Sequence, residues 1–322
     1  MFKFSLNPGK TNIDFLRYRI AALVFTALLT IATIGLVVGK GLNFGIDFTG
    51  GVLVEVETSG PADLGAMRDA LGDGSFGDVS LQNFGADNAV LIRLGQDAGE
   101  GDAQGRMVEA LRQTLSEKVD PNIQIQRAEF VGPKVGQELI EGAVIAFVVA
   151  IAAMMIYVWF RFEWQFGVGA VAALFHDVIM TIGMYAVTGY EFNLTSVAAV
   201  LTIIGYSLND TVVIFDRVRE NLRKYRDMTI LELLNRALND TLSRTIMTGL
   251  TTLIALFALY FVAGSALAGF TFAMIAGVFI GTYSTIFIAV PILVYLNLQK
   301  RQRGRVGADG NGDGEAEAEV KA

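Results

Sequence analysis

Cysteine is absent from the 322 residues, and histidine occurs once, at position 176. The lack of cysteine excludes a disulfide framework, a thiolate nucleophile and a cysteine-based metal site. A single histidine excludes a metal centre built from a histidine cluster. No nucleophile–base constellation, phosphate-binding loop or metal motif is present either. The sequence therefore predicts that the chain is not an enzyme in the usual sense and carries no cofactor.

Charged residues are missing from long stretches of the chain. They gather in residues 40–137, in residues 216–245 and after residue 298. Hydrophobic residues make up 53% of the sequence and the mean hydropathy is +0.49, which is too apolar for a protein that must present a polar shell to water. The net charge of −7 says little about partners, because the two signs lie on different segments.

Six apolar stretches reach the ~20 residues that a membrane-spanning helix needs. They are residues 20–38, 139–160, 166–187, 194–215, 246–262 and 267–296. The first is too long for the core of a cleavable signal peptide, and no suitable cleavage site follows it. We therefore expect an α-helical membrane protein with six transmembrane helices.

Basic residues indicate the orientation of these helices, because cytoplasmic loops are enriched in Lys and Arg. Such residues precede the first span, lie between spans two and three, lie between spans four and five, and follow the last span, among them Lys10, Arg17, Arg19, Arg161, Arg217, Arg219, Arg223, Lys224, Arg226, Arg236, Arg244, Lys300, Arg301, Arg303 and Arg305. With six spans, all four groups fall on one side. The sequence thus predicts that both termini are cytoplasmic.

The chain accordingly divides into five parts. These are an N-terminal cytoplasmic segment (1–19), transmembrane helix 1 (20–39), an extramembrane domain (40–137), transmembrane helices 2–6 with a cytoplasmic loop at 216–245 (138–298), and a tail (299–322). The tail is Gly-rich and acidic without apolar periodicity, which is typical of a disordered segment.

The extramembrane domain is long enough to fold by itself. Residues 51–57, 89–93 and 123–131 alternate between apolar and polar as strands do, whereas residues 62–71 and 104–119 have helical spacing. Strands that alternate with helices predict a small ferredoxin-like α+β fold. Its acidic residues lie singly on polar faces, so we expect a binding surface there and not a catalytic site.

Asp210 is a carboxylate inside an apolar span. It precedes Asp216, at the cytoplasmic end, by six residues, which places it roughly 9 Å inside the membrane. Such a residue is costly and usually faces the bundle interior or a wet cavity. Asn209 and Tyr206 could hydrogen-bond to it. Two interpretations remain open: a protonated aspartate that holds helices together, and a proton-relay or ion-coupling residue.

Arg244 opens the fifth span, and Thr248, Thr251 and Thr252 continue its face as a polar stripe. Its side chain could merely extend to the cytoplasmic headgroups. Alternatively, because Asp210 should lie at a similar depth on a helix that runs the other way, the two residues could form a switchable contact.

His176 and Asp177 lie near the middle of the third span. Adjacent residues point about 100° apart on a helix, so they cannot both face the same neighbour. A satisfied buried polar pair and a proton relay are equally compatible with this position, whereas a metal site is improbable without a second histidine.

Small residues recur at every fourth position of the sixth span: Ala273, Gly277, Gly281, Thr285 and Ala289. This spacing permits close helix packing, against a span of this chain or of another subunit.

Several of these segments match one known family. The motifs are GIDFTGG at 45–51, VGPKVG at 131–136, RFEW at 161–164, GYSLNDT at 205–211 with FDR at 215–217, SRT at 243–245 and GTYS at 281–284. Over residues 10–300 the chain resembles the SecF family, the smaller partners of SecD in the bacterial Sec protein-export machinery. The glycines of GIDFTGG could serve a tight turn into the first strand or a hinge between membrane and domain.

The resemblance implies a half-transporter of the RND superfamily, located in the bacterial inner membrane with its domain in the periplasm and completed by a SecD-like subunit. It implies use of the proton-motive force to complete preprotein translocation through the SecYEG channel after the ATP-driven step at SecA. By position, Asp210 and Arg244 match the family's residues tied to proton conduction. Membrane lipid and preproteins are the other expected partners, and nucleic acid is not.

Two alternatives come from other functional classes. One is an RND-like exporter of a small amphiphile or lipid, although a domain of ~95 residues is small for a substrate porter. The other is a passive scaffold for the translocation channel. Ionisable residues in the spans argue against a scaffold, which gains little from them.

Overall fold

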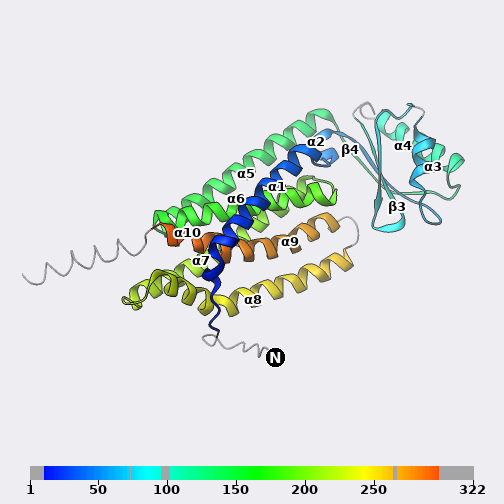
Figure 1. The fold of residues 1–322 in the computed structure, drawn as a ribbon. Coiled ribbons are helices and arrows are strands. Elements are labelled where there is room, and N and C mark those ends of the chain that lie inside the picture. Colours follow the sequence, from blue (N-terminus) through cyan, green and yellow to red (C-terminus); the bar gives the residue numbers. More distant parts are fainter. Residues whose placement is uncertain (1–10, 73, 96–101, 264–266, 297–322) are drawn as a thin grey trace, which may run out of the picture.

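A computed structural model describes residues 11–72, 74–95, 102–263 and 267–296. The predicted tail (299–322) and Lys10 lie outside these residues. Within them, six helices are long and apolar enough to cross a membrane, the number that the sequence predicts. They form one bundle, and a small α/β domain lies beyond one end of it (Figure 1).

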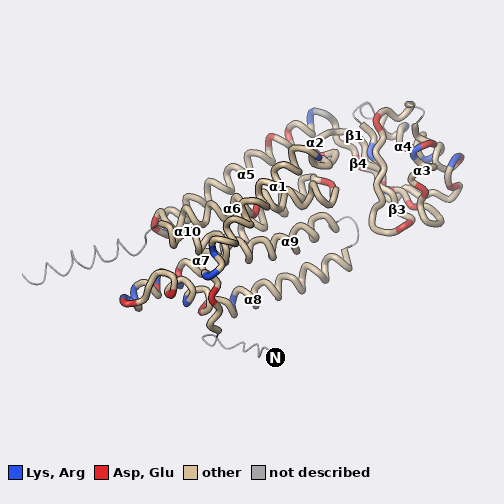
Figure 2. The backbone as a smooth tube through the Cα atoms, in the orientation of Figure 1, with Lys and Arg blue, Asp and Glu red and all other residues tan. Residues whose placement is uncertain are grey.

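The bounds of the spanning segments agree with the apolar stretches of the sequence. They are the 3₁₀ turn η1 (Phe15–Tyr18) with α1 (Arg19–Lys40), α5 (Pro133–Arg161), α6 (Trp164–Thr188), α7 (Leu194–Lys224), α8 (Ile230–Val262), and a sixth span made of α9 (Ala268–Ser284), the π-helical turn η4 (Thr285–Ala289) and α10 (Val290–Tyr295). Charged residues gather at the two ends of the bundle and on the domain (Figure 2). This distribution is the one that a hydrocarbon layer requires.

The helices contribute unequally to the bundle interior. α6, α7 and the sixth span supply most of its buried apolar residues, among them Phe166, Phe215 and Leu293. α1 and α5 instead expose large apolar side chains such as Ile31 and Ile145. In water such surfaces would be costly, but hydrocarbon is as apolar as these side chains.

The sixth span changes its helical winding next to a proline. Pro291 has no N–H with which to continue the regular hydrogen-bond ladder, and its ring crowds the carbonyl one turn earlier. The π-helical turn at Thr285–Ala289 absorbs this mismatch. It also brings the carbonyl of Ala289 close to Gly169 of α6, where a Cβ atom would lie only 2.6 Å from that oxygen.

The connection between the fourth and fifth spans is shorter than the predicted loop at 216–245. α7 continues to Lys224 and α8 begins at Ile230, so residues 225–229 alone connect them. Both extensions are amphipathic, and they bury Val218 and Leu234 in the main core. The prediction of a loop rests on the charges at 216–245 and neglects the apolar residues that lie at helical spacing between them.

The domain follows the order β-α-β-β-α-β. Its elements are β1 (Gly51–Glu57), α3 (Leu64–Leu71), β2 (Val79–Phe84), β3 (Ala86–Leu94), α4 (Asp102–Lys118) and β4 (Gln124–Val131). The strands pair antiparallel in the order β2-β3-β1-β4. Element order and strand order are those of a ferredoxin-like unit. Both helices pack on one face of the sheet, where Val54, Met67 and Leu111 form its core.

The sequence predicts three strands, and the structure adds β2. It is an edge strand that pairs with β3 alone, and none of its residues is fully buried. Its alternation of apolar and polar residues is short, because only Val79 and Leu81 alternate before Asn83 breaks the pattern.

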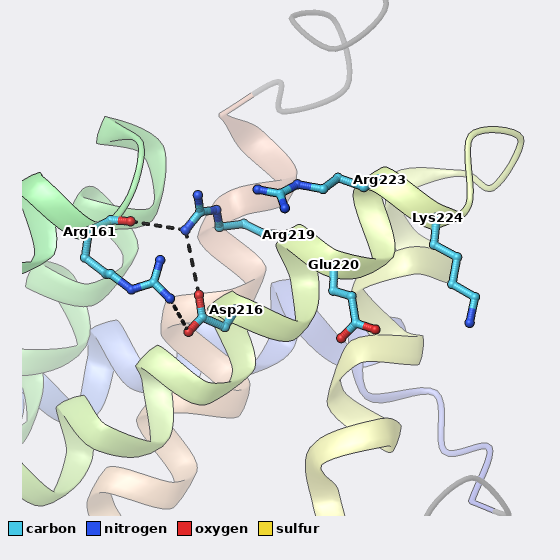
Figure 3. A pocket seen from close by; sticks show the side chains of 6 residues that line it. All are labelled: Arg161, Asp216, Arg219, Glu220, Arg223 and Lys224. Carbon is cyan, nitrogen blue, oxygen red and sulfur yellow. Dashed lines mark hydrogen bonds and ion pairs between the residues drawn. The ribbon is translucent and has the colours of Figure 1, made fainter.

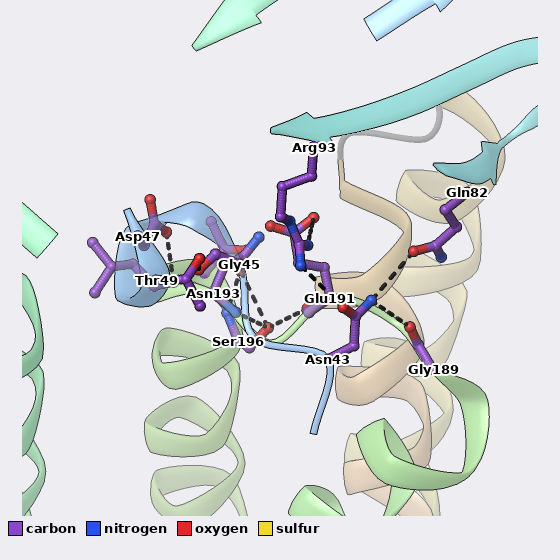
Figure 4. Close-up of polar contacts among 12 residues, drawn as sticks. Asn43, Gly45, Asp47, Thr49, Gln82, Arg93, Gly189, Glu191, Asn193 and Ser196 are labelled. Carbon is purple, nitrogen blue, oxygen red and sulfur yellow. Dashed lines mark hydrogen bonds and ion pairs between the residues drawn. The ribbon is translucent and has the colours of Figure 1, made fainter. Parts of the chain in front are cut away.

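The uncovered face of the sheet contacts the outer end of the bundle through polar side chains (Figure 4). Arg93 of β3 donates to Asn43 Oδ1 at 3.2 Å and pairs with Glu191 Oε2 at 3.3 Å, in the turn between α6 and α7. The backbones of Phe44 and Phe192 form an isolated β-bridge beside this pair. Burial raises the pKa of Glu191, and Arg93 opposes that rise.

The segment 45–51 combines a short helix with a tight turn. α2 (Ile46–Thr49) follows Gly45, and Gly50 and Gly51 then adopt φ values of +69° and +116°, which favour glycine. A Cβ atom at Gly51 would overlap the carbonyl oxygen of Leu94. The glycine pair thus allows β1 to start directly beside β3.

We expect the substitution Arg93→Gln to loosen the domain where it meets the bundle. It removes the charge that faces the half-buried Glu191, and a charge-assisted hydrogen bond contributes about 1.5–3 kcal/mol. Hydrogen exchange should therefore become about tenfold faster or more at Phe192, whose N–H donates to Asn43 O. Arg106→Gln, on an exposed position of α4, is the matched control and should change nothing. Equal exchange rates in the two variants would contradict the role of Arg93.

Candidate functional site

A carboxylate lies fully buried where α6, α7 and α9 meet. Asp177 of α6 has no exposed surface, and three groups point at its two oxygens. Oδ2 accepts from Ser207 Oγ of α7 at 2.5 Å and from Ser284 Oγ of α9 at 2.9 Å. Oδ1 lies 3.1 Å from His176 Nδ1. Asp177 therefore connects three spanning helices through hydrogen bonds in the apolar interior.

His176 also faces α9, which contradicts the prediction that it and Asp177 cannot face the same neighbour. Its ring lies 6.1 Å from that of Tyr283, centroid to centroid, and the Tyr283 hydroxyl is 2.9 Å from Thr26 Oγ1 of α1. Its Nε2 is buried and has no hydrogen-bond partner among the described residues. Polar groups thus extend from Asp177 toward α1.

A second carboxylate, Asp210, lies on the inner face of α7, one turn from Ser207. It is 8% exposed, and its Oδ1 accepts from Thr245 Oγ1 of α8 at 2.7 Å. Its Oδ2 is buried without a partner within the described part of the chain. A buried carboxylate with one oxygen unsatisfied is poorly suited to carry a charge, which makes it a natural place for a proton.

Arg244 and Asp210 do not form an ion pair among the described residues, although they lie at the same level. Arg244 precedes Thr245 on α8, so its side chain leaves the helix in a different direction and is exposed, while that of Thr245 enters the bundle. The predicted Asp–Arg contact would require the arginine to swing inward. Thr248 and Thr251, which were expected to extend its polar stripe, donate to carbonyls of their own helix.

Asn209 and Tyr206 take positions other than those expected for hydrogen bonds to Asp210. Asn209 is exposed, together with Thr202 and Gly205, on the face of α7 that no other described helix covers. Tyr206 is half-buried between this face and α8, near Gly249. Polar groups on an uncovered face of a spanning helix are disfavoured in lipid.

The small residues of the sixth span pack against α7 of the same chain. Cβ atoms added at Gly277 would overlap the side chain of Ile203, and at Gly281 they would lie 3.0 Å from Ser207 Cβ. This close approach brings Ser284 to Asp177 and Thr285 Oγ1 to within 2.9 Å of Thr211 Oγ1. Among the described residues, the stripe of small residues on the sixth span therefore faces α7 of the same chain.

We expect Gly277→Val to separate α7 from α9 and to destabilise the bundle by about 1–3 kcal/mol, the usual cost of overpacking. The fraction of protein that stays monodisperse in detergent after heating should fall at a lower temperature than for the unmodified chain. Gly35→Val provides the control, because a Cβ atom there meets nothing within 4 Å. If both variants lose stability equally, helix propensity and not packing explains the effect.

The sequence did not identify Thr245 and Ser207 as ligands of the two carboxylates. The only available signal was position: Ser207 precedes Asp210 by three residues, and Thr245 follows Arg244. Together these groups form a polar interior that can hold a proton at Asp210 Oδ2 and transmit a change between helices. The described residues contain no cluster of His, Asp and Glu that could hold a metal ion.

Residues 111–299 match the family described as protein export membrane protein SecD/SecF, C-terminal, and residues 35–62 match the SecD/SecF GG motif. The protein translocase subunit SecF of Rickettsia bellii is 42% identical over 303 residues, which cover 94% of this chain and 99% of the relative. That of Cereibacter sphaeroides is 45% identical over 309 residues, covering 93% and 94%.

Solved structures of SecDF show the same fold. SecDF of Thermus thermophilus, a translocon-associated membrane protein, superposes with a TM-score of 0.81 at 35% identity over 89% of this chain. A second SecDF structure, in a super-membrane-facing form, gives a TM-score of 0.66 at 34% identity over 93% of this chain. This chain spans only 39% and 40% of those two chains.

Proposed function

The chain belongs to the SecD/SecF family of protein export membrane proteins, and from that premise we propose that it couples the proton-motive force to preprotein export. Family membership accounts for a multi-pass membrane protein with an accessory role in Sec-dependent translocation. The proposal goes further, to the ion, the step and the residues. Protons move through the bundle by way of Asp210, and the work is done after the ATP-driven step at SecA.

One observation carries the proposal: the buried, half-satisfied carboxyl group of Asp210. With a proton on Oδ2, the group is neutral, and Arg244 stays at the surface. Loss of that proton leaves a charge that Thr245 alone cannot compensate, and Arg244 is the cation at the same level on α8. Movement of Arg244 toward Asp210 shifts α8 against α7. Protonation reverses this step, so a proton gradient drives a cycle.

Asp177 and its ligands support the cycle by tying the moving helix to its neighbours. Ser207 lies one turn from Asp210 on α7, and it donates to the carboxylate of α6 that Ser284 of α9 shares. A displacement of α7 at Asp210 therefore changes hydrogen bonds on both other helices. His176, with its Nε2 unpartnered, is the group through which protons reach or leave this second site.

A SecD-like subunit is the proposed partner, and the uncovered face of α7 is its docking surface. Thr202, Gly205 and Asn209 lie on this face. The chain corresponds in length to 39% of the SecDF chain of Thermus thermophilus, which leaves room in such an assembly for a second half-transporter. In this arrangement both termini lie in the cytoplasm of a bacterial cell, the α/β domain lies in the periplasm, and preprotein emerges beside it from the SecYEG channel.

The test is preprotein release from vesicles of inner-membrane lipid that contain SecYEG, a SecD-like chain and this chain. Translocation is first started with SecA and ATP, and the ATP is then removed. We expect an imposed proton gradient to release the stalled preprotein only when this chain is present. An ionophore that collapses the gradient is the matched control and should abolish release. Release that ignores the gradient would contradict the proposal, and release driven by a sodium gradient alone would replace the proton by sodium.

A further inference from the structure

A cavity of about 390 Å³ (Figure 3) opens beside the last turns of α7, at the end of the bundle opposite the α/β domain (Figure 1). It lies between the short turn that joins α5 to α6 and the last two turns of α7. Six charged side chains line it: Arg161, Asp216, Arg219, Glu220, Arg223 and Lys224. None of these residues takes part in the polar interior around Asp210 and Asp177.

Positive charge prevails in this cavity. Four of its six charged residues are basic, and both carboxylates are already engaged. Asp216 pairs with Arg161 at 2.9 Å and with Arg219 at 3.7 Å. Glu220 pairs at 2.7 Å with Arg217, which lies outside the lining. Arg223 and Lys224 form no ion pair among the described residues, so they remain available to an anion.

Two of the guanidinium groups are held in place before any ligand arrives. Arg219 donates from Nη1 to the carbonyl oxygen of Arg161 at 3.1 Å. Both guanidinium groups lie over the ring of Phe162, 5.3 and 5.4 Å from its centroid. A planar guanidinium that is already ordered loses little entropy when it binds, and its geometry matches two phosphate oxygens.

The surroundings identify the level of the cavity in the membrane. Trp159 and Trp164 flank the same turn and are 81% and 58% exposed. Exposed tryptophans gather where headgroups meet hydrocarbon. α5 continues from this turn with exposed apolar residues that suit acyl chains, for example Ile156 and Val149. A phosphate at the level of Arg161 would therefore have its acyl chains beside α5.

We propose that this cavity binds the phosphate of an anionic phospholipid headgroup. Arg161 and Arg219 provide the ordered guanidinium pair, and Arg223 and Lys224 supply the excess charge that favours an anionic lipid over a zwitterionic one. Basic pockets between spanning helices on the cytoplasmic side are known binding places for such headgroups. The lipid would fix the α5–α6 turn against the end of α7.

The binding test uses the purified full-length chain in a neutral detergent and native mass spectrometry. Phosphatidylglycerol and phosphatidylcholine with the same acyl chains are the two probes. We expect at least tenfold tighter binding of phosphatidylglycerol. The double variant Arg219→Gln/Arg223→Gln should lose this preference, whereas Arg17→Gln/Arg226→Gln, which removes the same charge at exposed positions elsewhere, should keep it.

A single variant and two competitors separate the remaining outcomes. Arg223→Gln changes an exposed side chain without an ion pair, so it leaves the fold intact and should weaken phosphatidylglycerol binding about threefold or more. Equal binding of both lipids, or equal loss in both double variants, would overturn the proposal. Displacement of the lipid by millimolar inorganic phosphate would mean that a free anion is the ligand. Displacement by a micromolar peptide of the acidic residues 306–322 would assign the cavity to the chain's own tail.

Discussion

Asp210→Asn is expected to reduce gradient-driven preprotein release by about tenfold or more, to the level of vesicles without a gradient. Asparagine has the size of aspartate, and its Oδ1 can still accept the hydrogen bond from Thr245. It cannot lose a proton within the range of the gradient, so the charge that attracts Arg244 never forms. Release of the stalled preprotein and proton uptake by the vesicles are the two measurements.

Controls for this variant come from the same chain. Asp227→Asn changes an exposed acid in the connection between α7 and α8 and should leave both measurements unchanged. Arg244→Ala should match Asp210→Asn, because it removes the other member of the proposed contact. Asp210→Glu retains a titratable group and should preserve part of the activity. Full activity of Asp210→Asn and Arg244→Ala together would favour a passive scaffold and eliminate the proton mechanism.

Asp177→Ala should have the largest effect on stability, a loss of about 3–5 kcal/mol. The substitution leaves a hole in the bundle interior, where Ser207 and His176 lose the carboxylate as partner and Ser284 keeps only its bond to the carbonyl oxygen of Gly281. A buried polar group that loses its hydrogen-bond partner retains the full free-energy cost of its desolvation. The temperature at which half of the purified protein leaves the monodisperse peak should fall by about 5–10 °C.

Asp177→Asn separates the structural and the proton-carrying roles of this residue. Asparagine retains one acceptor oxygen for the two serines, so we expect it to recover most of the stability. If Asp177 also carries protons, the same variant should still reduce gradient-driven release. Asp227→Ala is the control for truncation and should leave the thermal transition unchanged. An Asp177→Ala protein as stable as the unmodified chain would show that the three hydrogen bonds contribute little.

The spans could be predicted from sequence because hydrocarbon leaves so few choices. Twenty apolar residues in a row must form a helix there, since no water satisfies the backbone. Asp210 was identifiable for the same reason, because a carboxylate in such a stretch is conspicuous. Its ligand Thr245 was not. Most threonines in spanning helices bond to their own backbone, as Thr248 does, and only the packing of α7 on α8 distinguishes the two.

Other features could not be predicted from the sequence because they depend on contacts between residues far apart in the chain. β2 is a strand because β3 offers it a partner, and its own residues give a weak signal. Arg93 and Glu191 are 98 positions apart in sequence, and each looks like an ordinary surface charge. The Asp210–Arg244 contact was expected from equal depth alone. Depth follows from counting residues, but the direction in which a side chain leaves its helix depends on how that helix is rotated in the bundle.

The N-terminus of α7 is capped by its own Asn193 and also by a residue from outside the segment. Leu194 N donates to Asp47 Oδ2 at 2.9 Å, and Asp47 belongs to α2, which enters β1 directly. Asp210 lies 16 residues farther along the same unbroken helix, about 24 Å away. α7 is therefore a rigid connection between Asp210 and the segment that leads into the sheet. A tilt of about 5° at Asp210 would displace Asp47, and the sheet with it, by about 2 Å.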